Sequence, residues 1–100
     1  MRLKAGVKVG GLQPEMLLAV MIVQEILRVF NIETVITSGL DGVHSKNSKH
    51  YVGRAVDIRT RDIRPDTLPG IAQELQSRLG GEYYVLLEPT HIHIQFNGGK

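Results

Sequence analysis

The longest apolar stretch of the chain runs from Glu15 to Phe30 and is dense in Leu, Met, Ile and Val, with no glycine or proline inside it. Pro14 suits the first position of a helix, so the pattern predicts a helix that begins there. Because the segment from Met16 to Val23 is apolar on every face, we expect this half of the helix to be buried all round. The sequence therefore predicts a central core helix.

A second helix is predicted after Thr67, a residue type that caps helices, and Gly80-Gly81 predicts its end. Apolar side chains recur there at helical spacing. They are Leu68, Ile71, Ala72, Leu75 and Leu79. This helix is expected to be amphipathic.

Four short β-rich segments are predicted as strands, at 33–37, 55–59, 82–87 and 91–96. In the second of them, alternation directs Val56 and Ile58 into the core and Asp57 to the opposite face. The last two segments form either an antiparallel hairpin or one bent strand. The order of elements predicts an α+β fold, with two helices on a mainly antiparallel sheet, in one domain that spans residues 1–100.

Composition narrows the function classes. The chain has 100 residues, 42% of them hydrophobic, which suits one compact domain with a modest core. There is no cysteine, so any metal must be bound by histidine and carboxylate. The arginines of residues 54–64 are interrupted by aspartates, with no aromatic residues to stack on bases, so we interpret them as a solvated face and expect no nucleic-acid partner. The apolar segment is too short to span a bilayer and the first eleven residues lack a secretory signal, so we expect a soluble protein with no membrane partner.

All four histidines lie in two short stretches that also carry carboxylates. The stretches contain His44, His50 and Asp57, and then Glu88, His91 and His93. Taken singly, each residue has an ordinary explanation as a loop or surface side chain. Together they favour a metal site, because two histidines and one carboxylate around an open position are typical of catalytic zinc.

Local geometry supports that interpretation at both stretches. In a strand, His91 and His93 project to one face, with their backs to the core. His50 and Asp57 could not meet along one straight strand, but a turn at Gly53 would let both side chains reach a common ion.

These residues form a recognisable motif between Thr37-Ser38-Gly39 and Phe96. It reads Ser48-x-His50-x-x-Gly53-x-Ala55-x-Asp57, with His91-x-His93 downstream. The motif resembles the zinc D-alanyl-D-alanine carboxypeptidase and endopeptidase family, which includes phage endolysins and vancomycin-resistance dipeptidases. The resemblance implies bound Zn²⁺ and a small α+β fold shared with the hedgehog signalling domain.

By matching position, the resemblance makes His50, Asp57 and His93 the zinc ligands, with His91 beside the ion. In a second register, found in relatives with a single ligand histidine, Glu88 is the catalytic base and His91 is the third ligand. In both registers Glu88 and the two histidines border the metal. We favour the register with His93 as the ligand, because the His-x-His form is matched whole, and the other register remains the alternative.

The implied chemistry is hydrolysis without a covalent intermediate. Zinc lowers the pKa of bound water to about 7 and polarises the scissile carbonyl. Glu88 would take the proton of the water and deliver it to the leaving amine. His91, or alternatively His44, would steady the oxyanion, and Ser48 would brace the loop beside the substrate.

The chain departs from the family at one position. Many relatives carry an arginine just after the Ser-Gly pair, where it grips a substrate carboxylate, but here Ser38-Gly39-Leu40 is followed by Asp41. Lys46, Lys49 or Arg54 could substitute for it. Alternatively, the enzyme cuts within a peptide cross-bridge and needs no such anchor.

We therefore expect a monomeric zinc metallopeptidase that hydrolyses peptide bonds of bacterial peptidoglycan, in stem peptides or cross-bridges, as a carboxypeptidase or an endopeptidase. The short chain without an export signal suits a phage- or prophage-encoded protein that acts on the cell wall or stays in the cytoplasm until release. One alternative is a non-catalytic zinc-binding module of the same fold, used in wall binding or in a phage particle. Another is an unrelated fold in which the spacing is a coincidence.

Overall fold

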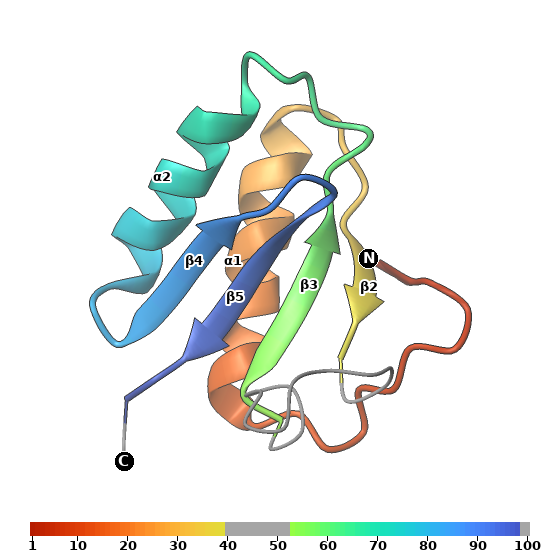
Figure 1. Cartoon of the computed structure of the whole chain (residues 1–100), viewed down its shortest axis with the longest axis vertical. Helices are drawn as coiled ribbons and strands as arrows, with labels where there is room; N and C mark the ends of the chain where they lie inside the picture. The colour runs from red at the N-terminus through yellow and green to blue at the C-terminus, as the bar shows by residue number, and fades with distance from the viewer. Residues whose placement is uncertain (40–52, 99–100) are drawn as a thin grey trace.

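The computed structural model describes residues 1–39 and 53–98, which form one five-stranded sheet with two helices on one of its faces (Figure 1). The strands are β1 (Arg2–Leu3), β2 (Val35–Ser38), β3 (Ala55–Arg59), β4 (Tyr83–Leu87) and β5 (His91–Phe96). The helices are α1 (Pro14–Val29) and α2 (Leu68–Leu79). The predicted α+β class is confirmed.

The strands lie in the order β1-β2-β3-β5-β4. All neighbouring strands are antiparallel except β1 and β2, which are parallel. The last two strands form a hairpin, so the hairpin is the correct one of the two predicted arrangements. β3 is the central strand of the sheet, and β5 lies between it and the edge strand β4; α2 connects β3 to β4 across the helical face (Figure 1).

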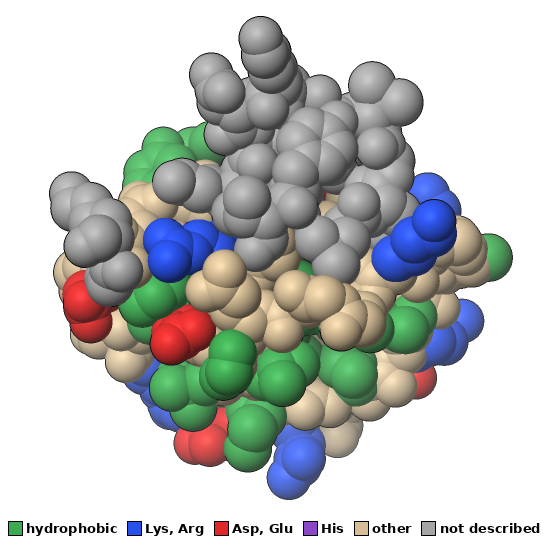
Figure 2. Space-filling model, turned by 90° about the horizontal axis from the view of Figure 1, so that it is seen from below, with side chains coloured by type: hydrophobic (Ala, Val, Ile, Leu, Met, Phe, Trp, Pro, Cys, Tyr) green, Lys and Arg blue, Asp and Glu red, His purple; other side chains and the backbone are tan. Residues whose placement is uncertain are grey.

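Helix α1 begins at Pro14, as predicted, but the expectation that its first half is buried all round is wrong. One side packs on the sheet, whereas Leu17 and Met21 on the other side are 53% and 63% exposed. No element of the described ranges covers that side. In the view from below, hydrophobic side chains gather in one part of the surface (Figure 2).

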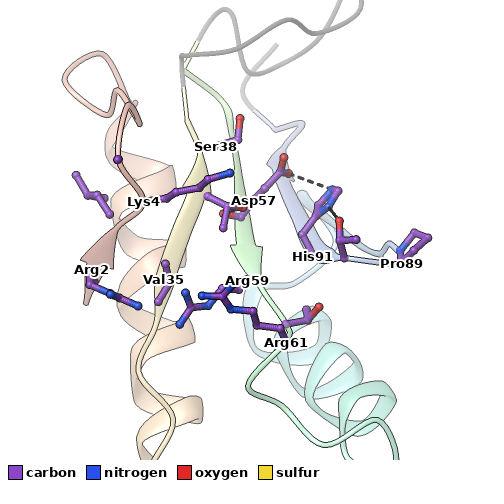
Figure 3. A pocket seen from close by; sticks show the side chains of 14 residues that line it. Arg2, Lys4, Val35, Ser38, Asp57, Arg59, Arg61, Pro89 and His91 are labelled. Carbon is purple, nitrogen blue, oxygen red and sulfur yellow. Dashed lines mark hydrogen bonds and ion pairs between the residues drawn. The ribbon is translucent and has the colours of Figure 1, made fainter.

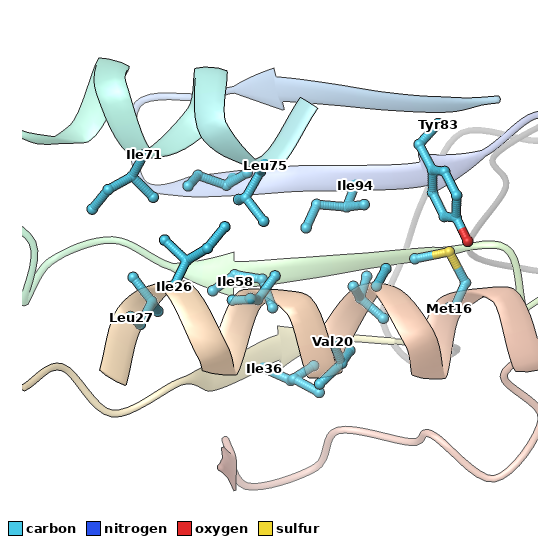
Figure 4. Packing of buried hydrophobic residues seen from close by; sticks show 14 of the residues in the cluster. Met16, Val20, Ile26, Leu27, Ile36, Ile58, Ile71, Leu75, Tyr83 and Ile94 are labelled. Carbon is cyan, nitrogen blue, oxygen red and sulfur yellow. The ribbon is translucent and has the colours of Figure 1, made fainter. Parts of the chain in front are cut away.

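The core lies between the helices and the sheet (Figure 4). Fully buried side chains of β3 and β5 meet Met16 and Leu27 of α1 and Leu75 of α2 there. The sheet contributes Val56, Ile58, Ile92 and Ile94. These four residues occupy alternate strand positions, so the predicted orientation of Val56 and Ile58 is confirmed.

Helix α2 ends at Leu79, and Gly80 follows it with a φ of 90°, a conformation that glycine adopts without strain, as the sequence predicts. The prediction that the side chain of Thr67 caps the start of α2 is wrong. Thr67 already has helical backbone angles and makes no capping hydrogen bond from its side chain. Pro69, in the first turn, fixes the backbone there instead. Neither helix in the described ranges is long and apolar enough to cross a membrane.

Candidate functional site

The face of the sheet away from the helices carries the candidate chemistry. Asp57 of β3 lies directly opposite His93 of β5, and Arg59 lies opposite His91. Cross-strand partners are direct neighbours on one face of a sheet, so this register brings the carboxylate and both imidazoles together. These side chains are the open-face counterparts of the buried core residues on the same two strands.

The contacts within this group are short. The Nδ1 atom of His93 lies 2.9 Å from Oδ1 of Asp57, and Nε2 of His91 lies 3.8 Å from the same oxygen. The hydroxyl oxygen of Thr90 lies 3.1 Å from Nδ1 of His91. Figure 3 shows His91 and Asp57 turned toward each other across the two strands. Both histidines therefore approach one carboxylate oxygen, and His93 approaches it more closely.

His93 is held at both ring nitrogens. Nδ1 lies 2.9 Å from Oδ1 of Asp57 and Nε2 lies 2.8 Å from Oε1 of Gln95, so both ring nitrogens face oxygen acceptors and the arrangement favours a ring that carries both protons. The hydrogen bond to Asp57 raises the pKa of His93 above its ordinary value, while burial acts in the opposite direction, and Gln95 and nearby carboxylates add smaller increases. A metal ion bound at His93 would have to replace one of these protons.

Gln95 was missed by the sequence reasoning. It follows His91 and His93 at the same two-residue interval on β5, so strand alternation places all three on the open face. Its amide also donates to Oδ1 of Asn97 at 2.8 Å. The alternation that singled out the two histidines was the signal that could have found it.

A β-bulge shapes the other side of Asp57. In the β2–β3 register, Ile36 pairs with Ile58 but Ser38 pairs with Asp57, so two residues of β2 oppose one of β3. The hydroxyl of Thr37 donates to the backbone oxygen of Asp57 at 3.4 Å. The bulge brings both Thr37 and Ser38 to the wall of the groove beside Asp57. A bulge has no reliable sequence signature, which is why these two side chains were not assigned to the site.

Glu88 stands at the turn of the β4–β5 hairpin. Its backbone N–H donates to the backbone oxygen of His91 at 2.8 Å, which continues the pairing of the two strands by one step. The same alternation puts Glu88 on the face of His91. Its negative charge contributes to the raised pKa of His93, although no direct contact joins the two side chains among the described residues.

A groove of about 870 Å³ opens on this face and includes Asp57 and His91 in its wall. Arg59 and Arg61 also line it, with Arg2 and Lys4 from the N-terminal segment (Figure 3). The interpretation of the arginines as a solvated face is therefore wrong for Arg59, whose side chain is only 16% exposed. The sequence could not show that the N-terminal segment folds alongside β2 and encloses this groove.

Gly53 has the backbone conformation that a turn requires, with φ of 73°, which bears out the predicted turn. A Cβ atom at this position would lie 2.2 Å from the backbone oxygen of Gly11. Gly39 is equally close to the N-terminal segment, since its Cβ would lie 2.3 Å from the oxygen of Lys8. Residues 8–13 thus pack against the chain at both positions, and Gln13 donates from its backbone to Gly53 at 2.9 Å.

Several predicted site residues fall in the segment 40–52, outside the described residues. They are His44, Ser48 and His50. The same segment holds Asp41, at the position where relatives carry the substrate-binding arginine, and its possible substitutes Lys46 and Lys49. Of the described candidates, Arg54 does not line the groove, because it packs over the ring of Phe96 at 5.8 Å and its Nε donates to Gln13 at 3.3 Å. Within 1–39 and 53–98, no three His, Asp or Glu side chains form a group that could hold a metal ion.

Comparisons of the chain with protein-family models, with curated proteins and with solved structures found no match. The resemblance to the zinc peptidases remains a prediction that its motif carries.

Proposed function

We propose that the protein is a zinc-dependent metallopeptidase that hydrolyses peptide bonds of bacterial peptidoglycan. The observation that carries the proposal is the approach of His93 and His91 to one carboxylate oxygen of Asp57, beside a groove large enough for a peptide. Only two strands supply these three side chains, and both lie in the interior of the sheet.

The donor atoms suit zinc. A carboxylate oxygen and imidazole nitrogens are ligands that Zn²⁺ binds, and a catalytic site needs three protein ligands and one open position. Asp57 and His93 would supply two of them. The third would be His50, which the resemblance to the zinc peptidases implies as a ligand.

The partly buried position of the pair argues against an ordinary surface contact. The side chains of Asp57 and His93 are 13% and 17% exposed, and withdrawing charged groups from water is costly unless they are paired or bind a metal. A fold stabilised only by packing gains little from such a pair, since apolar residues in its place would often do as well. The polar cluster is therefore better explained by function than by stability.

Each residue would have a distinct task. When bound, zinc supplies a water of lowered pKa and polarises the scissile carbonyl. Glu88, at the hairpin turn on the face of His91, would accept a proton from the attacking water and pass it to the leaving amine. His91, held by Thr90 and pointing toward Asp57, would donate a hydrogen bond to the developing oxyanion.

The test is a digest of purified peptidoglycan by the zinc-loaded protein, with the products identified by mass. We expect new amino or carboxyl termini within the peptides, and a loss of about 100-fold or more in rate for Glu88→Gln, the scale of a lost general base. Glu74→Gln on α2 is the matched control, because it makes the same change of charge on the helical side, and it should retain full activity.

The result also separates catalysis from binding alone. Loss of hydrolysis in Glu88→Gln with an unchanged zinc content supports the peptidase. A wild-type protein that binds zinc and peptidoglycan but releases no peptide would instead be a non-catalytic wall-binding module.

A further inference from the structure

A basic groove adjoins the candidate site along β3. Four cationic side chains from two separate parts of the chain line it: Arg2, Lys4, Arg59 and Arg61. Of the described residues in its wall, Asp57 alone is acidic. The groove therefore offers positive charge directly beside a carboxylate that a metal would neutralise.

Two of these cations are already paired by acids outside the groove wall. Arg2 lies 3.2 Å from Glu33, and Arg59 lies 2.5 Å from Asp62. Lys4 and Arg61 make no side-chain hydrogen bond or ion pair in the parts of the chain that the structure describes. Their charges are available to a ligand.

Arg59 has a further unused donor. Its Nε atom is buried and lacks a hydrogen-bond partner among the described residues. A buried donor left without an acceptor costs free energy, and such an atom in a native structure calls for an explanation. An anion in the groove is an acceptor that a small rotation of the guanidinium would bring within reach.

The charges are arranged in order along the groove. Asp57 and Arg59 are two residues apart on one face of β3, which places them about 7 Å apart, and Arg61 follows beyond the end of the strand. In Figure 3, Lys4 reaches across the sheet toward Ser38 and Asp57, while Arg59 and Arg61 extend in the direction of Arg2 and Val35. The groove would therefore suit a ligand that has one end beside Asp57 and an acidic group at the other end, next to Arg59 and Arg61.

We propose that this groove is an anion subsite that binds the carboxylates of an acidic peptide, through Arg59 and Arg61 at one end and through Lys4 nearer Asp57 (Figure 3). The guanidinium fork matches the planar carboxylate, and the apolar side chains of Leu3, Val35 and Pro89 leave the rest of the wall suited to a peptide. The described lining residues include no Phe, Tyr or Trp, the larger aromatic side chains on which nucleic-acid bases commonly stack.

The identification of the peptide as a peptidoglycan stem peptide rests on the proposed function. Many members of the zinc peptidase family carry an arginine just after the Ser-Gly pair, which this chain lacks after Gly39. The cations of the groove would take over its task of binding a substrate carboxylate. The carboxylate bound at Arg59 and Arg61 would lie about 7 Å or more from a scissile peptide bond placed beside Asp57. It would therefore belong to a residue of the peptide near that bond and would not take part in the cleavage.

The experiment compares two probes by calorimetry: a stem peptide with free carboxylates and the same peptide with its carboxyl groups amidated. The full chain carrying Glu88→Gln is used, because Glu88 does not line the groove and its loss prevents turnover during the titration. We expect amidation to weaken binding about tenfold or more, since a charge-assisted hydrogen bond is lost. Affinity for the free peptide should also fall as salt is raised.

Variants locate the effect. Arg61→Gln and Lys4→Gln should each weaken binding of the free peptide several-fold and leave the amidated peptide unchanged. Arg64→Gln is the matched control, because Arg64 belongs to the same connection, makes the same change of charge and is paired with Asp66 at 3.0 Å outside the groove wall. It should bind as the parent protein does.

Three results would overturn the proposal. The first is equal affinity for the two peptides, and the second is an equal loss in Arg61→Gln and Arg64→Gln, which would indicate general charge attraction. The third is inorganic phosphate that binds more tightly than the free peptide and loses affinity in Arg61→Gln, which would assign the groove to phosphate.

The proposed function fails separately from this subsite. Carboxylate-dependent binding in a protein that never hydrolyses peptidoglycan would refute the peptidase and keep the subsite. Equal kcat/KM of the wild-type protein on free and amidated peptides would refute the subsite and keep the peptidase.

Discussion

The two faces of β3 and β5 carry opposite kinds of residues, although the residues alternate along the same strands. Toward the helices, Ile58 and Ile94 are fully buried in an apolar core. Toward the open side, Asp57 lines a groove and shares a hydrogen bond with His93. A shift of one residue in register would exchange the two sets, so the same apolar packing that holds the fold also fixes where the polar side chains lie.

The two faces should also respond to different perturbations. Apolar packing depends on the volume that is filled and responds little to pH. The polar face depends on protonation, because the Asp57–His93 contact uses a charged donor. Substitutions and conditions that act on one face alone therefore test the division.

The largest effect on stability is expected from Ile94→Ala, on the core face of β5. The substitution removes buried side-chain volume next to the helices and should lower the free energy of unfolding by about 2–5 kcal/mol, measured by urea denaturation. Zinc bound per folded molecule should not change. A loss of less than about 1 kcal/mol would show that the core face is not as tightly packed as the structure indicates.

Gly53→Ala should have the next largest effect, because it acts on the connection that leads into β3. Alanine there would adopt φ of 73° and meet the oxygen of Gly11, a strain of about 1–3 kcal/mol. Gly81→Ala is the matched control, since no atom lies near its Cβ, and it should change stability by less than about 0.5 kcal/mol. Equal results for the two variants would contradict the close approach at Gly53.

The pH dependence of the metal-free protein should isolate the open face. Because the pKa of His93 is raised in the folded state by Asp57, its stabilising contribution is full below the ordinary histidine value of about 6.5 and is lost as pH rises through the folded pKa. The free energy of unfolding of the wild-type protein should thus fall as pH rises from about 6.5 through the folded-state pKa of His93. His93→Gln and Asp57→Asn should both lack this decrease, and a decrease that persists in both would assign it to other groups.

The smallest effect is expected at Met21 on the outer side of α1. Since this side chain is largely exposed, Met21→Gln should change the free energy of unfolding by no more than about 0.5 kcal/mol. Val20→Ala, which truncates the adjacent buried side chain, should be clearly destabilising. A large loss for Met21→Gln would mean that this side is covered in solution.

Most of the fold could be predicted, because α1, α2, β3 and β5 each carry a clear periodicity. The failures have physical causes. β1 has two residues, too few for an alternating pattern, and it forms a strand because its backbone pairs with β2. The burial of α1 was overestimated because an apolar sequence shows what a helix tolerates and not which neighbours cover it.

The site was predictable where strand alternation governs it. Alternation correctly places His91 and His93 on one face and Asp57 on the face away from the core, and the register then makes Asp57 and His93 neighbours. The groove was not predictable, because Lys4 and Arg61 are far apart in the sequence and line the same groove only because of the path of the N-terminal segment. Whether His50 completes the cluster is a prediction about a residue outside the described ranges.

The most direct test of the central claim is the zinc affinity of the wild-type protein and of His50→Gln, Asp57→Asn and His93→Gln, measured by competition with a chelator of known affinity at pH 7.5. We expect one zinc ion per wild-type chain. Each variant should lose more affinity than the roughly 10–100-fold that a hydrogen-bond partner behind a ligand typically contributes. Wild-type protein that binds no zinc, or three variants that bind it as tightly as the wild type, would contradict the claim that the open face of β3 and β5 is a metal centre.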